Sequence, residues 1–236
     1  MISIIIPAYN GADFLDSALA SIDAQQVTDR EVILVDDGSK AELKPPAGAR
    51  YFRQARRGPG AARNRGVQES RGELLAFLDI DDMWDPGHLS RLFAALIAHP
   101  EAGIAQGAMR QLCGNRISGI YRMPYIGSCM FRREVFESCG GFDETMTLGE
   151  DHDLMYRCWE RDIVKVHVAE VSLIYRRHGG NTSRGNNIRS HLMVLKRRLE
   201  RIRAGVIDTS EKRRFQFQEY IGNTEGARQW TNWSAS

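Results

Sequence analysis

Short, almost continuously apolar runs alternate with longer amphipathic stretches over the first hundred residues. The runs predict strands over residues 2–8, 31–36 and 73–79, and a shorter strand near Tyr51 and Phe52. Apolar runs without polar interruption are typical of parallel strands that are covered on both faces. The stretches between them predict helices over residues 10–24, 60–70 and 85–100, the first capped by Asn10 or Asp13. This alternation of strands and helices indicates an open α/β sheet.

The regular alternation ends near residue 104. Residues 104–140 favour shorter strands and one turn of helix, residues 150–162 a helix, and residues 164–176 further strands. A basic amphipathic helix is predicted over residues 188–203. We therefore divide the chain into residues 1–105, residues 106–187 as a second half of the same domain, and a helical tail over residues 188–236.

The composition is that of a soluble globular protein with one main core. The chain has 236 residues, 42% of them hydrophobic and 26% charged, with a formal net charge of +2. So balanced a charge gives no reason to expect nucleic-acid binding, and no apolar run is long enough to cross a membrane. The four cysteines form no C-x-x-C pair and no secretory leader precedes the first strand, so we expect reduced thiols and a cytoplasmic location.

Acidic residues gather where two of the predicted strands end. The run LAFLDIDD ends in Asp79, Asp81 and Asp82, and EVILVDD ends in Asp36 and Asp37. The carboxyl ends of parallel strands share one edge of the sheet, where the ligands of open α/β sheets bind. Three close acids repel one another unless something positive lies beside them. Asp79 and Asp81 therefore indicate a divalent metal ion, with phosphate oxygens completing its shell.

Each acidic cluster also has a simpler interpretation. Asp82 or Asp85 could cap the helix that follows, and for Asp85 we favour this interpretation. Asp36 and Asp37 open the sequence D-D-G-S, which is typical of a tight turn. They could therefore shape that turn, or accept a hydrogen bond from a base or a ribose hydroxyl.

Three further motifs carry candidate chemistry. RRGPGAARNRG places glycines and Arg63 at the start of a helix, which suits an anion, although it lacks the dinucleotide-binding spacing after the first strand. GEDHDL has more acids than a helix cap needs, so one carboxylate could be a general base. His178 precedes the glycine-rich loop HGGNTS, where it is either structural or a ligand for metal or phosphate beneath a hinged lid.

Seven motifs give the chain a family resemblance. SIIIPAYN, VDDGS, GPGAARNRG, AFLDIDD, GGFDE, GEDHDL and YRRHGGNTS follow one another as in family 2 glycosyltransferases, which the chain resembles over about residues 1–185. The resemblance implies the GT-A fold, a Rossmann-like, mixed and mainly parallel α/β sheet flanked by helices. It also implies inverting transfer of a sugar from a nucleotide-diphospho-sugar, with UDP the expected nucleotide. Residues 1–105 would then bind the donor, and residues 106–187 would bind the acceptor and carry the catalytic base.

The resemblance places the donor nucleotide at the ends of the first two strands. Pro7, Ala8 and Tyr9 would wall the nucleotide pocket. Asp36 would accept a hydrogen bond from the base, and Arg63 would lie near the base or the diphosphate.

The D-I-D sequence would bind the rest of the donor. Asp79, with Ile80 beside it, would face the ribose or the sugar, and Asp81 would bind Mn²⁺ or Mg²⁺. His178 would close over the metal or the diphosphate, and Asp82 would support the turn. A metal ion there would act as a Lewis acid for the departing diphosphate, which gives the three acids a cation to bind.

The resemblance also implies how the acceptor reacts. Asp151 would remove the proton of the acceptor hydroxyl, and Glu150 beside it would shape the acceptor site. A lipid-linked or saccharide acceptor, as in the synthesis of cell-envelope polysaccharide or another glycoconjugate, is expected. Processive members carry a Q-x-x-R-W sequence and membrane helices, whereas ARQW near the end of this chain departs from it. We therefore expect the transfer of a single sugar.

Two other functions fit part of the sequence. A degenerate transferase would bind nucleotide-sugar or glycan without turnover, but a pure binder has no need of Asp81, Asp151 and His178 together. A metal-dependent phosphotransferase of the haloacid-dehalogenase type also carries D-x-D after a strand. That motif continues with Gly-Thr or similar residues, whereas Met83 follows Asp82 here.

The basic tail has two interpretations. One side of its predicted helix carries the apolar residues Met193, Leu195, Leu199 and Ile202, and arginines lie around them. We favour a helix that packs on the domain and exposes its basic face. The alternative is an interfacial helix against anionic lipid, aided by Trp230 and Trp233, in a protein peripheral to the inner face of the membrane.

Overall fold

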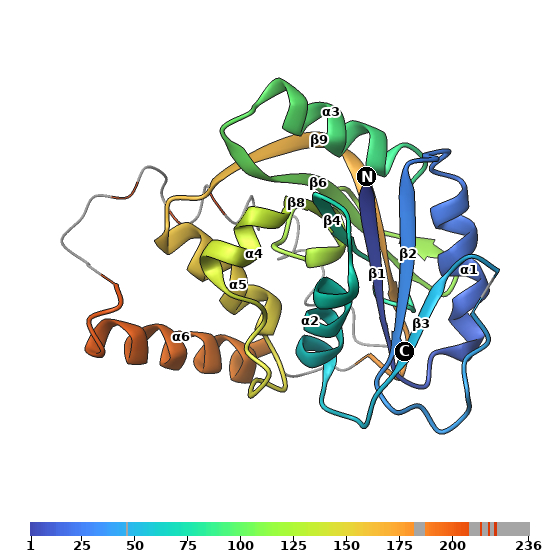
Figure 1. Cartoon of the computed structure of the whole chain (residues 1–236), viewed down its shortest axis with the longest axis horizontal. Coiled ribbons are helices and arrows are strands. Elements are labelled where there is room, and N and C mark those ends of the chain that lie inside the picture. Colours follow the sequence, from blue (N-terminus) through green and yellow to red (C-terminus); the bar gives the residue numbers. More distant parts are fainter. Residues whose placement is uncertain (46, 182–186, 208–212, 214–216, 218–219, 221–236) are drawn as a thin grey trace.

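One mixed sheet with helices on both faces forms the centre of the protein (Figure 1). The computed structural model describes residues 1–45, 47–181 and 187–207, together with Arg213, Phe217 and Tyr220. The strands are β1 Ile2–Ala8, β2 Arg30–Asp36, β3 Arg50–Arg53, β4 Leu74–Phe77, β5 Met83–Trp84, β6 Ala102–Cys113, β7 Arg116–Ile117, β8 Cys129–Arg132 and β9 Val164–Arg177. The helices are α1 Ala12–Asp23, α2 Pro59–Glu69, α3 His88–Ala98, α4 Arg133–Cys139, α5 Glu150–Glu160 and α6 Asn187–Arg203, with a 3₁₀ turn, η1, at Ile126–Ser128. The predicted α/β fold is confirmed.

The order of the strands brings the acidic motifs to one edge. In the described residues the sheet runs β3-β2-β1-β4-β8-β6-β9-β5, with β7 paired to β6. β3, β2, β1 and β4 are parallel, β8 is antiparallel to β4 and β6, and β6 and β9 are parallel. Because β1, β2 and β4 point the same way, Asp36 at the end of β2 and Asp79 after β4 share the carboxyl edge.

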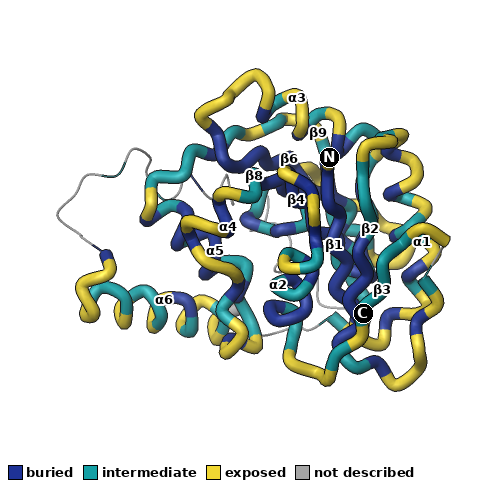
Figure 2. Tube along the Cα trace, viewed as in Figure 1, coloured by how far each residue is buried: buried dark blue, intermediate teal, exposed yellow. Residues whose placement is uncertain are grey.

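Both faces of β1 are buried, as its uninterrupted apolar run predicts. Ile4 and Ile6 pack into a core that they share with α1 and α3. Ile5 points the other way, into a core with α4 and α5. Figure 2 shows the sheet strands largely buried and the exposed residues concentrated on the outer helices and loops. The first helix is less well predicted at its start, because Gly11 precedes it and neither Asn10 nor Asp13 caps it.

Glycines also precede α3 and α5, where polar caps were predicted. α3 begins after Gly87 and α5 after Gly149, and no side chain caps either helix. Both glycines have positive φ, 83° and 79°, which glycine adopts without strain. Asp85 is therefore not the cap of α3, and its carboxylate instead forms an ion pair with Arg91 at 3.1 Å.

The shorter strands predicted over residues 104–140 are wrong at their start, because β6 is a single long strand. It runs beside β9 with shifts of register near Ala102 and on both sides of Ala108. Polar Gln106 interrupts its apolar pattern, but its side chain is buried and accepts a hydrogen bond from Lys165 of β9 at 2.8 Å. In the sequence, a buried polar residue whose hydrogen bonds are made inside the protein cannot be distinguished from a polar residue that ends a strand.

The predicted tail helix is present as α6, which lies along α5 at the margin of the molecule (Figure 1). Its Val194 is buried against the domain. None of the helices in the described part of the chain is long and apolar enough to cross a bilayer. Trp230, Trp233 and the ARQW sequence lie outside the described residues.

Candidate active site

A buried arginine joins the acidic turn after β4 to the start of α5. Arg63, in α2, donates to Asp79 Oδ1 at 2.7 Å and to Glu150 Oε1 at 2.6 Å. Only 5% of Arg63 is exposed. The guanidinium therefore fixes two motifs against each other that lie far apart in the sequence.

The carboxyl groups around Arg63 are crowded. Desolvation raises the pKa of Asp79, the nearby charges of Asp81 and Asp151 raise it further, and Arg63 opposes both effects. Desolvation likewise raises the pKa of Glu150. Net negative charge is therefore only partly neutralised by the protein itself, and the site attracts a cation.

Asp81 faces His178, at the carboxyl end of β9. His178 Nε2 lies 2.9 Å from Asp81 Oδ2, and Asn181 Nδ2 donates to the same oxygen at 3.1 Å. The His178 ring packs on Phe14, with 4.7 Å between centroids. These contacts bring together the two predicted metal ligands, although they are almost a hundred residues apart in the sequence.

Asp81 and His178 offer two ligands to a divalent metal ion. The 2.9 Å between the two atoms is a hydrogen-bond distance, and the Gly180 N–H donates to His178 Nδ1, so a bound ion would have to replace the contact between His178 and Asp81. The Asp81 carboxylate suits Mn²⁺ or Mg²⁺, whereas an imidazole such as that of His178 is the more usual ligand of Zn²⁺, Cu²⁺, Fe or Ni²⁺. Within the described residues, however, no cluster of three or more His, Cys, Asp or Glu side chains forms a complete metal site.

Asp82 points inward from the same turn. It is 2% exposed and accepts a hydrogen bond from the backbone N–H of Arg176 at 2.8 Å. Burial, followed by the charges of Asp81 and Asp79, raises its pKa well above the ordinary value. Asp82 thus ties the acidic turn to β9.

Asp151 lies in the first turn of α5, beside the Arg63 network. Its Oδ1 accepts the backbone N–H of His152 at 2.8 Å, and 18% of its side chain is exposed. Its charge acts on both Arg63 and Asp79. A partly exposed carboxylate at a helix N-terminus, close to the acidic turn, can accept a proton from a bound hydroxyl.

Asp36 is not open to solvent. Its side chain is fully buried and accepts hydrogen bonds from the Ser39 N–H at 2.8 Å and the Tyr51 hydroxyl at 2.9 Å. Burial would raise the pKa of Asp36, but these hydrogen bonds and the charge of Arg53 lower it overall. The structure therefore places Asp36 beneath the turn rather than in an open pocket.

Asp37 organises the loop that leads to α2, a role that the sequence did not reveal. Its carboxylate accepts from the backbone N–H groups of Arg57 and Gly58, at 2.8 and 2.7 Å, and from the side chain of Gln54 at 2.9 Å. The D-D-G-S sequence signalled a turn, but nothing in it indicated contacts about twenty residues further along the chain.

The end of β1 carries the other predicted donor residues. Pro7 and Ala8 are buried, and Tyr9 is 37% exposed. The guanidinium of Arg56 lies 4.0 Å from the centroid of the Tyr9 ring. Ile80 is buried against Gly11, at the start of α1. Arg56 was not predicted, and its only signal was the pair of arginines that precedes G-P-G.

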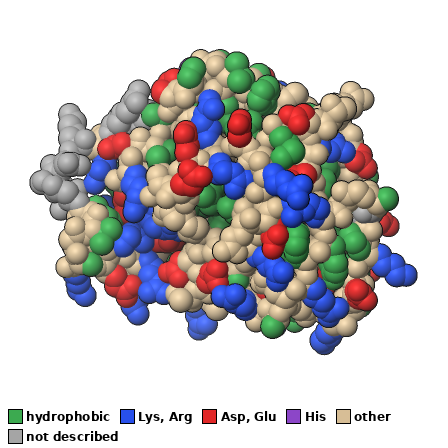
Figure 3. All heavy atoms as spheres, viewed as in Figure 1, with side chains coloured by type: hydrophobic (Ala, Val, Ile, Leu, Met, Phe, Trp, Pro, Cys, Tyr) green, Lys and Arg blue, Asp and Glu red, His purple; other side chains and the backbone are tan. Residues whose placement is uncertain are grey.

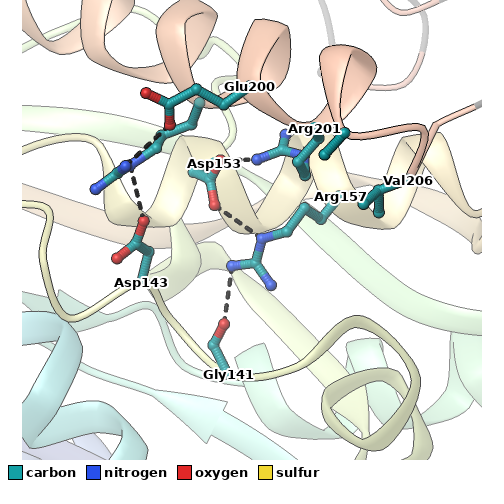
Figure 4. A pocket seen from close by; sticks show the side chains of 9 residues that line it. Gly141, Asp143, Asp153, Arg157, Glu200, Arg201 and Val206 are labelled. Carbon is teal, nitrogen blue, oxygen red and sulfur yellow. Dashed lines mark hydrogen bonds and ion pairs between the residues drawn. The ribbon is translucent and has the colours of Figure 1, made fainter.

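A second set of ion pairs lies behind α5, away from the acidic turn. Asp153 of α5 pairs with Arg157 at 2.8 Å and with Arg201 of α6 at 2.7 Å (Figure 4). Arg201 also forms an ion pair with Glu160, and Arg198 forms a second ion pair with Glu160 at 3.1 Å. A hollow of about 460 Å³ lies among these side chains, and none of the residues that line it belongs to the acidic turn.

The chain is similar to known proteins in sequence. Residues 3–138 match the model of the family described as Glycosyl transferase family 2. An uncharacterized glycosyltransferase of Nostoc sp. (strain PCC 7120) is 39% identical over 100 residues, covering 39% of this chain and 31% of that protein. One of Rickettsia conorii is 36% identical over 206 residues, covering 75% of this chain and 34% of that protein. The matches thus span about a third of each relative's length.

Solved structures share the fold. The mannosyltransferase PcManGT from Pyrobaculum calidifontis, in complex with GDP-Man and Mn²⁺, has a TM-score of 0.67 at 19% identity, over 83% of this chain and 64% of that one. S. aureus TarS 1–349, in complex with UDP-GlcNAc, has a TM-score of 0.63 at 18% identity, over 76% of this chain and 59% of that one. At such low identity the likeness establishes the fold alone.

Proposed function

Because the chain belongs to glycosyl transferase family 2, we propose that it moves a single sugar from a nucleotide-diphospho-sugar to an acceptor hydroxyl, with inversion at the anomeric carbon. The observation that carries this proposal is the pair of contacts from Arg63 to Asp79 and Glu150. They hold the turn that would face the donor within reach of the helix that begins with Glu150 and Asp151. Donor and base would then lie close together around Arg63.

Asp151 is the proposed general base. It would accept the proton of the acceptor hydroxyl while the hydroxyl oxygen attacks the anomeric carbon. The bond from that carbon to the diphosphate breaks on the opposite side, and the nucleoside diphosphate leaves. Attack opposite the leaving group accounts for inversion. Glu150, held by Arg63, would shape the acceptor side.

Asp81 and His178 would hold Mn²⁺ or Mg²⁺, and we expect donor phosphate oxygens to complete its shell. When bound, the ion supplies Lewis-acid stabilisation of the departing diphosphate. Asp79 would face the ribose or sugar, with Ile80 behind it. Asp82 would keep the turn in place through β9.

We expect the nucleotide to lie at the ends of β1 and β2. Pro7, Ala8 and Tyr9 would wall its pocket. Because Asp36 is fully buried and both its oxygens already accept hydrogen bonds or face Arg53, it would support the turn beside this pocket rather than contact the base directly. PcManGT was solved with GDP-Man and TarS with UDP-GlcNAc, so a panel of both nucleotides is the right test. UDP remains our expectation, and a lipid-linked or saccharide hydroxyl our expected acceptor.

A thermal-shift panel tests the donor site. Wild type, Asp81→Asn and Asp85→Asn would be heated with UDP, GDP and their sugars, with and without Mn²⁺. A ligand that binds only the folded state stabilises it by about 2.7 kcal/mol at a hundredfold excess over Kd. We expect a Mn²⁺-dependent shift with one nucleotide that is lost in Asp81→Asn. Asp85→Asn is the matched control, because Asp85 pairs with Arg91.

Failure of the panel has a definite meaning. If no nucleotide shifts the wild-type melting temperature, Asp79 and Asp81 do not form a working donor site. If the shift is unchanged in Asp81→Asn or in the absence of metal, the metal assignment is wrong. Metal-dependent binding without any turnover would favour a degenerate transferase that binds donor only.

A further inference from the structure

α6 has an inner face that is fixed to the domain. Val194 is 2% exposed, and Arg197 pairs with Asp143 at 3.0 Å. A Cβ on Gly149, just before the first turn of α5, would lie 2.5 Å from Ser190 Oγ. Together with the pairs from Arg201, these contacts prevent α6 from turning its other face toward the core.

The outer face of α6 carries a continuous apolar stripe. Ile188, Leu192, Leu195 and Leu199 are 76%, 60%, 45% and 52% exposed. Their spacing of four, three and four residues places them on one line along the helix. Figure 2 shows exposed residues along the free edge of α6. Large apolar side chains gathered in one exposed line mark an interaction surface.

Cations border this stripe. Arg189, Lys196 and Arg203 follow one another at seven-residue spacing, which places all three on the same border, and all three are exposed. Figure 3 shows blue side chains projecting from the lower left margin, where α6 lies. The only acid within α6, Glu200, already pairs with Arg197 at 3.0 Å and Lys196 at 3.9 Å. The surface therefore combines apolar contact with net positive charge.

The charge pattern argues against a second copy of the chain as the occupant. The stripe has the heptad spacing of a coiled-coil seam, whose flanking positions meet across the interface. In α6 those positions hold Arg189, Lys196 and Arg203 on one side and His191 and Arg198 on the other. Antiparallel self-pairing would set the exposed Arg189, Lys196 and Arg203 of one copy against those of the other, which is unfavourable.

We propose that the outer face of α6 docks on the surface of an anionic lipid bilayer. Apolar side chains would enter the interface while the neighbouring cations contact lipid headgroups. A lipid surface needs no matched register, because its headgroups are mobile, and α6 lies at the margin of the described part of the molecule (Figure 1). The start of α6 lies against Gly149, so docking would bring the first turn of α5 near the headgroups. That last consequence rests on the proposed transfer, whereas the docking does not.

Vesicle flotation of the full chain tests the proposal. Vesicles of phosphatidylcholine alone would be compared with vesicles that also contain phosphatidylglycerol, at low and high salt. We expect binding to the anionic vesicles only, weakened by salt. The double variant Leu192→Ser/Leu195→Ser should lower the partition coefficient at least about tenfold. Lys196→Glu/Arg203→Glu should abolish the preference for anionic lipid.

A matched control comes from α3, which also exposes two large apolar residues four positions apart. Phe93 and Ile97 are 43% and 61% exposed, so Phe93→Ser/Ile97→Ser should leave vesicle binding unchanged. Circular dichroism melts of each variant exclude loss of the fold. No binding to anionic vesicles, or equal binding by the Leu192→Ser/Leu195→Ser variant, would overturn the proposal. So would a dimer in sedimentation velocity that this variant abolishes, because the occupant would then be a second copy.

Discussion

The negative charge of the buried Asp82 destabilises the fold. Burial and the charges of Asp81 and Asp79 raise its pKa. A carboxyl whose pKa is raised on folding stabilises the fold in its protonated form, and that contribution is lost as pH rises through the folded pKa. The wild-type protein should therefore become less stable, relative to an uncharged variant, as the solution becomes more basic.

Asp82→Asn tests this cost. Asparagine can still accept the hydrogen bond from the Arg176 N–H, but it carries no charge. In metal-free buffer at about pH 8, we expect the free energy of unfolding to rise by about 1–2 kcal/mol, and the gain to shrink toward about pH 4. Urea denaturation at several pH values measures it, with Asp85→Asn as control. A variant less stable than wild type at the higher pH would contradict the explanation.

His88 shows the opposite shift. Its side chain is 0% exposed and stacks on Trp84, with 4.3 Å between ring centroids. Neither ring nitrogen has a hydrogen-bond partner in the described part of the chain. Burial, with a smaller effect of Arg91, lowers the pKa of His88 to about 3. The unfolded chain binds a proton here below about pH 6.5, so stability should fall as pH drops from there toward 3.

His88→Phe should remove this dependence while keeping the stack on Trp84. Below about pH 6 the slope of unfolding free energy against pH should fall by up to about 1.4 kcal/mol per pH unit. Acid titration of urea-unfolding curves gives the slope. His99→Gln, at a site whose side chain is 52% exposed, should keep the wild-type slope. An unchanged slope in His88→Phe would show that His88 is protonated in the fold.

At the residue scale, local motifs were predictable and long-range partners were not. The acids of the turn and His178 could be singled out because each motif is contiguous and follows a strand or opens a helix. The sequence could not place Arg63 between Asp79 and Glu150, because its contact with Glu150 spans 87 residues. The sequence also could not show that Asp36 would be buried beneath the turn, because D-D-G-S predicts a turn whether its first aspartate is buried or exposed.

At the scale of elements, α6 is expected to hold α5 in place. Arg201 pairs with Asp153 and Glu160, whose side chains are 2% and 1% exposed. Arg201→Ala would leave two buried carboxylates short of a partner, although Arg157 and Arg198 remain. We expect a loss of about 2–3 kcal/mol in the free energy of unfolding.

Arg203→Ala is the matched control for this prediction, because Arg203 lies two residues further along α6 and is exposed. Its effect should stay within about 0.5 kcal/mol. Chemical denaturation of both variants gives the comparison. Equal stabilities for the two variants would mean that α6 does not brace α5.

The spacing of apolar residues predicted those helices and strands in which no polar residue interrupts the apolar pattern. β1, β2, α2, α5 and α6 lie close to their predicted ranges. The pattern failed where tertiary contacts replace local rules, as in β6, where Gln106 is satisfied by Lys165. The cap predictions failed at the starts of α1 and α3, because Gly11 and Gly87 precede these helices and no polar side chain caps them.

At the scale of the whole molecule, the division at residues 105 and 106 remains a prediction about function. β6 runs through this boundary, so the two halves share one sheet. The contact from Arg63 to Glu150 crosses the boundary and would couple donor and acceptor sides during transfer. The outer face of α6 would then set the orientation of the site around Arg63 at a lipid surface.

The rate of donor turnover in Asp151→Asn is the most direct test of the central claim that Asp151 is the base. Wild type and variant would be compared at saturating concentrations of the donor that binds, with Mn²⁺ present. Loss of a general base should lower the rate by about 10²–10⁴-fold while the donor Kd stays unchanged. A variant that turns over donor within a few-fold of the wild-type rate would contradict the claim, and so would a wild-type protein that binds donor without any turnover.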